Sequence, residues 1–305
     1  MTEPDPSGTQ PEQVAPGCYR HPDRPTWVRC NRCERPICPD CMNDAAVGFQ
    51  CPECVKEGAK GQRVARTTFG GTARPDDTPV ITFVLIGLNV LVFVAALASG
   101  TVPGSNSLTI LHERFANLAA PVSAPDANGA LMVFRGVSDG EYYRLVTAMF
   151  LHFGFGHIAF NMLALFSLGP QLERLFGRVR FLALYLVAGF CGNVATYALG
   201  PPGQFAAGAS TAIFGLFAAY FIVARRMRAD TSQIVGLLAI NLVITFVFPN
   251  IDWRGHVGGL VGGALIAGAL VYAPRDRRSL IQALGVGAVL ALALLAVVVR
   301  TANLS

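Results

Sequence analysis

Four polar residues that could carry out nucleophilic catalysis stand among apolar residues in the second half of the chain. Ser210 opens an apolar run that continues to about Val223, and His256 opens another. His157 and Asn161 lie four residues apart in a third run, so a helix would place them on one face. A serine hydroxyl becomes a nucleophile when a base takes its proton, and histidine is the usual base. These residue types predict a Ser-His dyad. His157, Asn161 and the serine backbone amide are candidate donors to an oxyanion.

The composition indicates that the apolar runs cross a membrane. The chain has 305 residues, of which 52% are hydrophobic and 14% charged, and its mean hydropathy is +0.46. After Val80, apolar runs of roughly 17–25 residues recur, which is the length that crosses a bilayer as a helix. We predict an all-α polytopic membrane protein with seven spans, at about residues 80–99, 145 or 156 to 172, 180–199, 208–223, 234–248, 255–272 and 280–299.

The arginines predict how the spans are oriented. They cluster before the first span and between spans two and three, four and five, and six and seven. Because basic residues concentrate on the cytoplasmic side, we expect a multi-pass protein of the cell membrane with a cytoplasmic N-terminus and an extracytoplasmic C-terminus. The net charge of +5 comes mainly from arginines at the ends of apolar runs, which argues against binding to nucleic acid.

In this orientation the second, fourth and sixth spans all start at the outer surface, so the four polar residues share one depth. Ser210 alone could serve helix packing, since small residues let helices approach closely in lipid. Polar groups on three spans at one depth instead favour a site, because they are costly in lipid unless they face a cavity or each other. On the sixth span, Gly259 and Gly263 share a face with His256 and offer a flat surface to the fourth helix.

The N-terminal segment carries eight metal-ligand residues in four pairs, and each pair has two residues between its members. The pairs are Cys18 and His21, Cys30 and Cys33, Cys38 and Cys41, and Cys51 and Cys54. Eight such ligands are enough for two tetrahedral zinc sites. A disulfide framework is the alternative. It is the weaker one, because we expect no secretory signal in the first 16 residues, which lack an apolar core.

This segment resembles the B-box class of cross-braced zinc modules. The resemblance implies interleaved pairing, with sequential pairing still open: Cys18, His21, Cys38 and Cys41 on one ion, and Cys30, Cys33, Cys51 and Cys54 on the other. Sites filled by protein ligands are structural, so we expect the module to dock a cytoplasmic partner. The predicted division is a disordered tail at 1–16, a B-box-like zinc module at 17–56, a flexible linker at 57–79 and a membrane domain at 80–300.

Several motifs of the membrane half resemble, in order, those of the rhomboid family of intramembrane serine proteases. They are Glu141-Tyr142-Tyr143-Arg144, Gly156-His157-Ile158-Ala159-Phe160-Asn161-Met162, Leu172-Glu173 with Gly177, Gly208-Ala209-Ser210, and His256-Val257-Gly258-Gly259. The resemblance implies a rhomboid-like six-helix core with the seventh span as an addition. It implies that Ser210 is the nucleophile and His256 the general base. His157, Asn161 and the serine amide would form the oxyanion hole. The implied substrates are transmembrane segments of single-span proteins, cut in the lipid bilayer near the outer leaflet.

Two positions depart from the family pattern. Thr211 stands where glycine is usual, and Tyr143 stands where tryptophan is common. The β-branched Thr211 beside the nucleophile keeps an alternative open, a catalytically weak or inactive rhomboid-like factor that binds or escorts membrane proteins. A solute transporter is a further alternative, although neither repeated halves nor a midplane site is visible. Phe214, one turn after Ser210, could stack on the histidine or simply face lipid or core.

Overall fold

A computed structural model of the protein describes residues 14–61, 65–73, 78–100, 108–125, 131–248 and 251–304. The chain divides into two units, Met1–Val64 and Ala65–Ser305. Apart from residues 14–16, the predicted disordered tail lies outside the described residues.

The first unit has little regular structure and an unusual core. Its elements are the 3₁₀ helix η1 (Pro39–Cys41), the antiparallel strands β1 (Asn43–Asp44) and β2 (Phe49–Gln50), and helix α1 (Pro52–Gly61). Its buried cluster consists of Ile37 and six cysteines. A segment of this size, whose core is made of thiols, has too little apolar surface to fold on hydrophobic burial alone. The predicted metal ligands therefore form the core of this unit.

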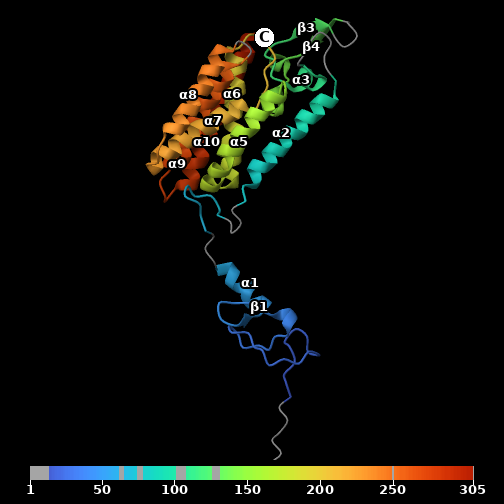
Figure 1. The fold of residues 1–305 in the computed structure, drawn as a ribbon, viewed down its shortest axis with the longest axis vertical. Coiled ribbons are helices and arrows are strands. Elements are labelled where there is room, and N and C mark those ends of the chain that lie inside the picture. Colours follow the sequence, from blue (N-terminus) through green and yellow to red (C-terminus); the bar gives the residue numbers. More distant parts are fainter. Residues whose placement is uncertain are drawn as a thin grey trace, which may run out of the picture. The chain divides into compact units, whose positions relative to one another are not determined.

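The second unit is a bundle of helices (Figure 1). The long helices are α2 (Val80–Ala98), α5 (Phe155–Phe176), α6 (Arg178–Leu199), α7 (Ser210–Met227), α8 (Ser232–Val247), α9 (Trp253–Tyr272) and α10 (Arg278–Leu304). The segment between α2 and α5 contains α3 (Ile110–Phe115), strands β3 (Val122–Pro125) and β4 (Leu131–Phe134), η2 (Val137–Asp139), α4 (Arg144–Thr147) and η3 (Ala148–Phe150). Strands β3 and β4 pair antiparallel.

The long helices lie where the sequence predicts membrane spans. Five of them, α2, α6, α7, α9 and α10, are long and apolar enough to cross a bilayer by themselves. Arg144–Phe150 and Phe155–Phe176 would add one span if counted together, but they meet at a 90° bend. The second predicted span therefore has its straight part in α5, nearer the later of the two predicted starts. Helix α8 has 16 residues and is shorter than the others, so the count of seven spans stays a prediction.

Helix α7 lies at the centre of the bundle. Within the hydrophobic stretch of each helix, 61% of α7 is buried, against 28% of α2 and 22% of α10. Figure 1 shows α2 along one edge of the bundle. A Cβ on Gly259 or Gly263 of α9 would overlap the backbone of α7, at Thr211 and Gly215 respectively. The two helices thus cross at backbone contact, as the flat glycine face predicts.

Two buried charged side chains, Glu173 and Arg144, form hydrogen bonds that connect separate segments of this bundle. The Glu173 carboxylate near the end of α5 accepts hydrogen bonds from the backbone N–H groups of Ile81 and Thr82, at 2.9 and 2.8 Å. It therefore satisfies free N–H groups in the first turn of α2. Arg144 donates from Nε to Glu141 and from Nη1 to the Ala116 carbonyl, at 2.6 and 2.8 Å. These bonds hold the segment that precedes α5.

The structure differs from the predicted linker at 57–79. Residues 57–61 continue α1, and residues 65–73 form a turn against the membrane helices instead of a flexible tether. Phe69 is buried, its N–H donates to the Leu175 carbonyl, and its ring lies 5.3 Å from that of Phe176. The Gln282 side chain of α10 donates to the Phe69 carbonyl at 2.9 Å. Phe69 thus anchors this glycine-rich segment to the membrane helices. The composition of the segment did not indicate such packing.

The glycine crossing gives a prediction about stability. Gly259→Ala should destabilise the membrane domain by about 1–3 kcal/mol, because the new methyl group would push α9 away from α7. Gly268→Ala on the same helix is the matched control, since nothing lies within 4 Å of a Cβ there. Thermal unfolding of both variants in detergent measures the difference. Equal midpoints for the two variants would contradict the backbone contact.

Candidate active site

Ser210 and His256 meet where α7 and α9 begin. Ser210 is the first residue of α7, and His256 lies in the first turn of α9. The serine Oγ and the histidine Nε2 are 2.8 Å apart, which is hydrogen-bonding distance. The close contact of α9 with α7 at Gly259 and Gly263 sets this distance, because a wider separation of the two helices would move the two side chains apart. The pair has the geometry of a nucleophile next to a general base.

The other ring nitrogen of His256 has a partner that sequence reasoning missed. Thr245, in the last turns of α8, has its Oγ1 2.7 Å from His256 Nδ1. The same hydroxyl donates to the Asn241 carbonyl at 2.7 Å. Thr245 and Ile234 are the buried residues of α8. The available signal was a lone hydroxyl near the outer end of the fifth span, at the predicted depth of the site.

Two neighbours of Ser210 can be placed. The Phe214 ring stacks on the His256 ring, with centroids 4.2 Å apart and planes 17° from parallel. The structure thus favours stacking over a lipid-facing role for Phe214. The Thr211 side chain packs against Gly192 of α6 and Gly255 of α9, where a Cβ would come within 3.0 Å of it. The glycines of those neighbouring helices therefore accommodate the β-branched residue.

His157 lies beside the backbone that precedes the nucleophile. Gly208 has φ of 141°, which side-chain-bearing residues rarely adopt. A Cβ at Gly208 would be 2.8 Å from His157 Nε2 and 3.4 Å from Ser210 Oγ, so both atoms border the same point. The Phe153 N–H donates to His157 Nδ1 at 3.4 Å. A neutral ring that accepts at Nδ1 carries its proton on Nε2, so the nitrogen beside Gly208 is a donor.

Asn161 is buried one turn further along α5, but its amide is used within the helix. Asn161 Nδ2 donates to the His157 carbonyl at 3.0 Å, and among the described residues no hydrogen bond joins it to Ser210. The first N–H groups of α7 have no acceptor inside the helix, and that of Ser210 is one of them. The partial positive charge at a helix N-terminus adds to what such donors offer an anion.

The remaining candidate side chains have structural surroundings. His152 Nε2 lies 3.5 Å from the backbone N–H of Ala209, next to the nucleophile. His112 caps its own helix through Thr109, with Nδ1 2.9 Å from the threonine hydroxyl, and stacks on Phe153. Burial lowers the pKa of His112 to about 4, so this imidazole is neutral at ordinary pH. Cys191 of α6 is half-buried and packs with apolar residues, as expected of a small hydrophobe.

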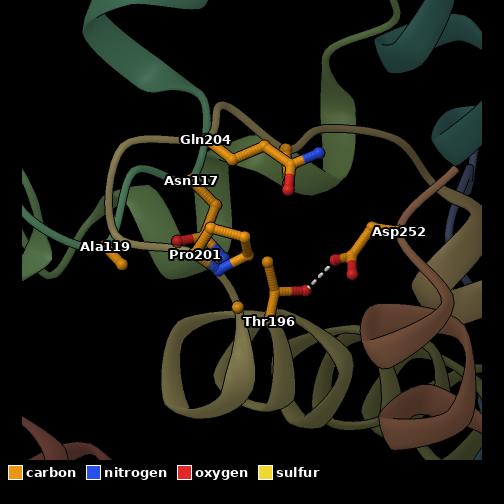
Figure 2. A pocket seen from close by; sticks show the side chains of 8 residues that line it. Asn117, Ala119, Thr196, Pro201, Gln204 and Asp252 are labelled. Atoms are coloured by element: carbon orange, nitrogen blue, oxygen red, sulfur yellow. Dashed lines mark hydrogen bonds between the residues drawn. The ribbon is translucent and has the colours of Figure 1, made fainter. Parts of the chain in front are cut away.

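A small polar pocket lies beside the start of α9 (Figure 2). Its volume is about 10 Å³, and Asn117, Thr196, Gln204 and Asp252 are among the residues that line it. The Asp252 carboxylate accepts from the Arg254 backbone N–H at 3.2 Å and from the Thr196 hydroxyl. Asp252 thereby caps α9 one turn before His256 and ties it to α6. Sequence reasoning gave this aspartate no role, although it is an acid four residues before the histidine.

The N-terminal unit contains two clusters that could hold metal ions. They are Cys18, His21, Cys38 and Cys41, and Cys30, Cys33, Cys51 and Cys54, and within each the ligand atoms lie within 4.8 Å of one another. This is the interleaved arrangement. All eight cysteines of the chain are free thiols, so the structure does not support a disulfide framework. Burial alone would raise the pKa of Cys30, but backbone N–H groups, first that of Cys51, lower it to about 6. Burial raises the pKa of Cys54 in the same cluster to about 12, so without a metal the thiols of this cluster differ in how readily they form the thiolate that binds metals.

Comparison with known proteins assigns the membrane half to a family. The Rhomboid domain matches residues 139–273. RHOMBOID-like protein 7 of Arabidopsis thaliana is 30% identical over 229 residues, which are 68% of this chain and 72% of that protein. The chain belongs to the rhomboid family. The predicted helical rhomboid fold is thereby confirmed, and this rhomboid carries two N-terminal Cys/His clusters compatible with a zinc module.

Two relatives from Bacillus subtilis (strain 168) also match this rhomboid. Rhomboid protease GluP is 36% identical over 197 residues, which are 63% of this chain and 35% of GluP. YdcA, a candidate rhomboid protease by its name, is 41% identical over 148 residues, which are 47% of this chain and 74% of YdcA. The rhomboid thus spans about a third of GluP and three quarters of YdcA.

Proposed function

We propose that this rhomboid is an intramembrane serine endopeptidase that cleaves single-span membrane proteins near the extracytoplasmic leaflet by a Ser-His dyad. The observation that carries the proposal is the 2.8 Å contact between Ser210 Oγ and His256 Nε2 at the starts of two membrane helices. The protease names of GluP and YdcA support the same class of reaction. In the proposed first step, Nε2 takes the serine proton while Oγ attacks the carbonyl carbon of the scissile peptide bond.

The hydrogen bonds around Thr245 support His256 as the base. A threonine hydroxyl has one proton, and here it is donated to the Asn241 carbonyl. The hydroxyl oxygen must then accept at its second contact, which means that the proton of the neutral imidazole is on Nδ1. Nε2 is left with a lone pair directed at Ser210. In this proposal Thr245 selects the basic tautomer, a task that a buried carboxylate performs in Ser-His-Asp triads.

Two donors are proposed for the oxyanion of the tetrahedral intermediate. One is the backbone N–H of Ser210 at the start of α7, and the other is the Nε2–H of His157 beside Gly208. Donors aimed at developing negative charge are commonly the largest single contribution to acyl-transfer catalysis. Asn161 is proposed as a third donor only if its amide rotates away from the His157 carbonyl, to which it now donates.

The dyad is tested by labelling the purified, detergent-solubilised protein with a fluorophosphonate probe, which reacts with activated serines. Wild type should be labelled. Ser210→Ala should abolish labelling, and His256→Ala should lower its rate at least a hundredfold, because general-base help contributes about 10²–10⁴. Cys191→Ala is the matched control in the same bundle and should label normally. Correctly folded wild type that is not labelled would overturn the proposal and favour the non-cleaving binding factor.

The role of Thr245 is tested with two substitutions. Thr245→Val keeps the shape of the side chain but removes the hydroxyl, so both imidazole tautomers become available. The labelling rate should fall about tenfold, which corresponds to roughly 1.4 kcal/mol. Thr245→Ser keeps the hydroxyl and should retain most of the wild-type rate. If the valine variant labels as fast as the serine variant, the hydroxyl does not position the base.

We further propose that the two Cys/His clusters bind two structural zinc ions. Sulfur and imidazole ligands in sets of four suit tetrahedral Zn²⁺, and a closed set leaves no open position for chemistry. Native mass spectrometry of the intact protein should show two zinc ions. Cys51→Ser should remove one of them and leave the other, since Cys51 belongs to only one cluster. A fully metal-free protein in which residues 14–61 resist protease would contradict this.

The orientation and the partner of the N-terminal unit are part of the same proposal. Arginines at the ends of the spans favour a cytoplasmic N-terminus. A cytoplasmic partner protein would then bind the zinc module. Protease added outside sealed cells should leave the N-terminal unit intact. Its removal by that protease would reverse the orientation and, with it, the compartment in which a partner is sought.

A further inference from the structure

A crevice lies at the far end of the bundle from the proposed active site, between α6, α9 and α10. Its volume is about 460 Å³, within the range of small-molecule sites. Ala183, Leu270 and Val286 contribute to an apolar wall, and Arg180, Ser279 and Gln282 add polar groups. Helix α6 begins at Arg178, α10 begins at Arg278 and α9 ends at Tyr272, so the crevice starts at one membrane surface.

Arg180 is held rigidly in this crevice. Its Nε donates to Gln282 Oε1 at 2.6 Å and its Nη2 donates to the Ser279 hydroxyl at 3.3 Å. The amide of Gln282 is itself fixed, because its Nε2 donates to the carbonyls of Phe69 and Leu270, at 2.9 and 2.7 Å. A guanidinium has five N–H donors, so Arg180 keeps donors for a further acceptor.

The positive charge around Arg180 is not neutralised. Arg66 and Arg278 are close enough for their charges to act on that of Arg180. Over the part of the chain that the structure describes, neither Arg180 nor these two arginines has a carboxylate partner; their hydrogen bonds go to neutral oxygens. The Nε–H of Arg278 is buried and lacks an acceptor there. Arg180 lines the apolar crevice, and Arg278 directly precedes Ser279 of the same wall, so this end of the crevice suits an anion that has an apolar tail.

We propose that this crevice binds an anionic phospholipid, with the headgroup phosphate at Arg180 and one acyl chain along the apolar wall. From Ser279 to Gly287 the crevice follows about 12 Å of α10, from the headgroup level into the hydrocarbon region. Leu280 and Leu284 on the same helix are exposed, so α10 faces lipid. Basic pockets between membrane helices are suited to anionic headgroups. This inference does not depend on the proposed proteolysis.

The test is a titration of the full-length protein in detergent with fluorescently labelled phosphatidylglycerol or phosphatidylcholine. Phosphatidylglycerol should bind more tightly. Arg180→Gln and Arg278→Gln should each weaken its binding about fivefold and leave phosphatidylcholine unchanged. Arg225→Gln is the matched control, an exposed arginine in the last turn of α7 outside the crevice, and should have no effect.

A second variant tests the acyl-chain half of the site without touching a charge. Gly287→Leu should fold, because nothing lies within 4 Å of a Cβ at Gly287, and it should weaken binding of both lipids by filling the crevice. Equal affinity for the two lipids, or equal losses with Arg180→Gln and Arg225→Gln, would overturn the proposal. Displacement of phosphatidylglycerol by inorganic phosphate, with no effect of Gly287→Leu, would also overturn it and leave a simple anion site.

Discussion

The backbone contact between α7 and α9 is the constraint on which the rest of the membrane domain depends. Gly215, Gly259 and Gly263 leave no side chain between the helices, so their axes approach more closely than larger residues would allow. This closeness brings a serine on one helix and a histidine on the other into hydrogen-bonding distance. Of the five helices long and apolar enough to cross a bilayer alone, α7 is buried to the largest extent. The short distance between Ser210 and His256 therefore depends on the glycines, which place no side chain between the two helices.

Hydrogen bonds satisfy several of the polar groups that lie inside the bundle, although the Thr211 hydroxyl there is buried without a partner. Glu173 accepts from the first turn of α2, Asp252 accepts from the first turn of α9, and Thr245 reaches from α8 to His256. In lipid no water is available to replace such bonds, so each buried polar group needs a protein partner. An unpaired polar group in lipid is energetically costly. The hydrogen bonds that avoid this cost also connect helices far apart in sequence. The bonds of Thr245 and Asp252 therefore both satisfy buried polar groups and orient the start of α9, where His256 lies.

The sequence was informative where a pattern repeats locally. Apolar runs predicted the helices. Polar residues at the expected outer ends of three runs pointed to Ser210 and His256, whose side chains lie 2.8 Å apart. Thr245 and Asp252 escaped prediction because their partners depend on how helices pack, which spacing along one helix does not encode. The docked turn at Phe69 was missed for the same reason. Asn161 lies on the expected face of its helix, but its amide donates to the His157 carbonyl of the same helix. Spacing along the sequence does not indicate which acceptor an amide will use.

The core of the N-terminal unit has a consequence for how the two parts of the chain respond to their surroundings. Apart from Ile37, its buried cluster is made of cysteines that also form the candidate metal sites. If the clusters hold zinc as proposed, metal binding and folding are the same event for this unit, whereas the membrane domain is stabilised by helix packing. Scarcity of the proposed ion would then unfold the N-terminal unit and leave the membrane domain folded. In this proposal the chain joins a unit whose folding depends on the cellular supply of metal to a domain whose folding depends on helix packing.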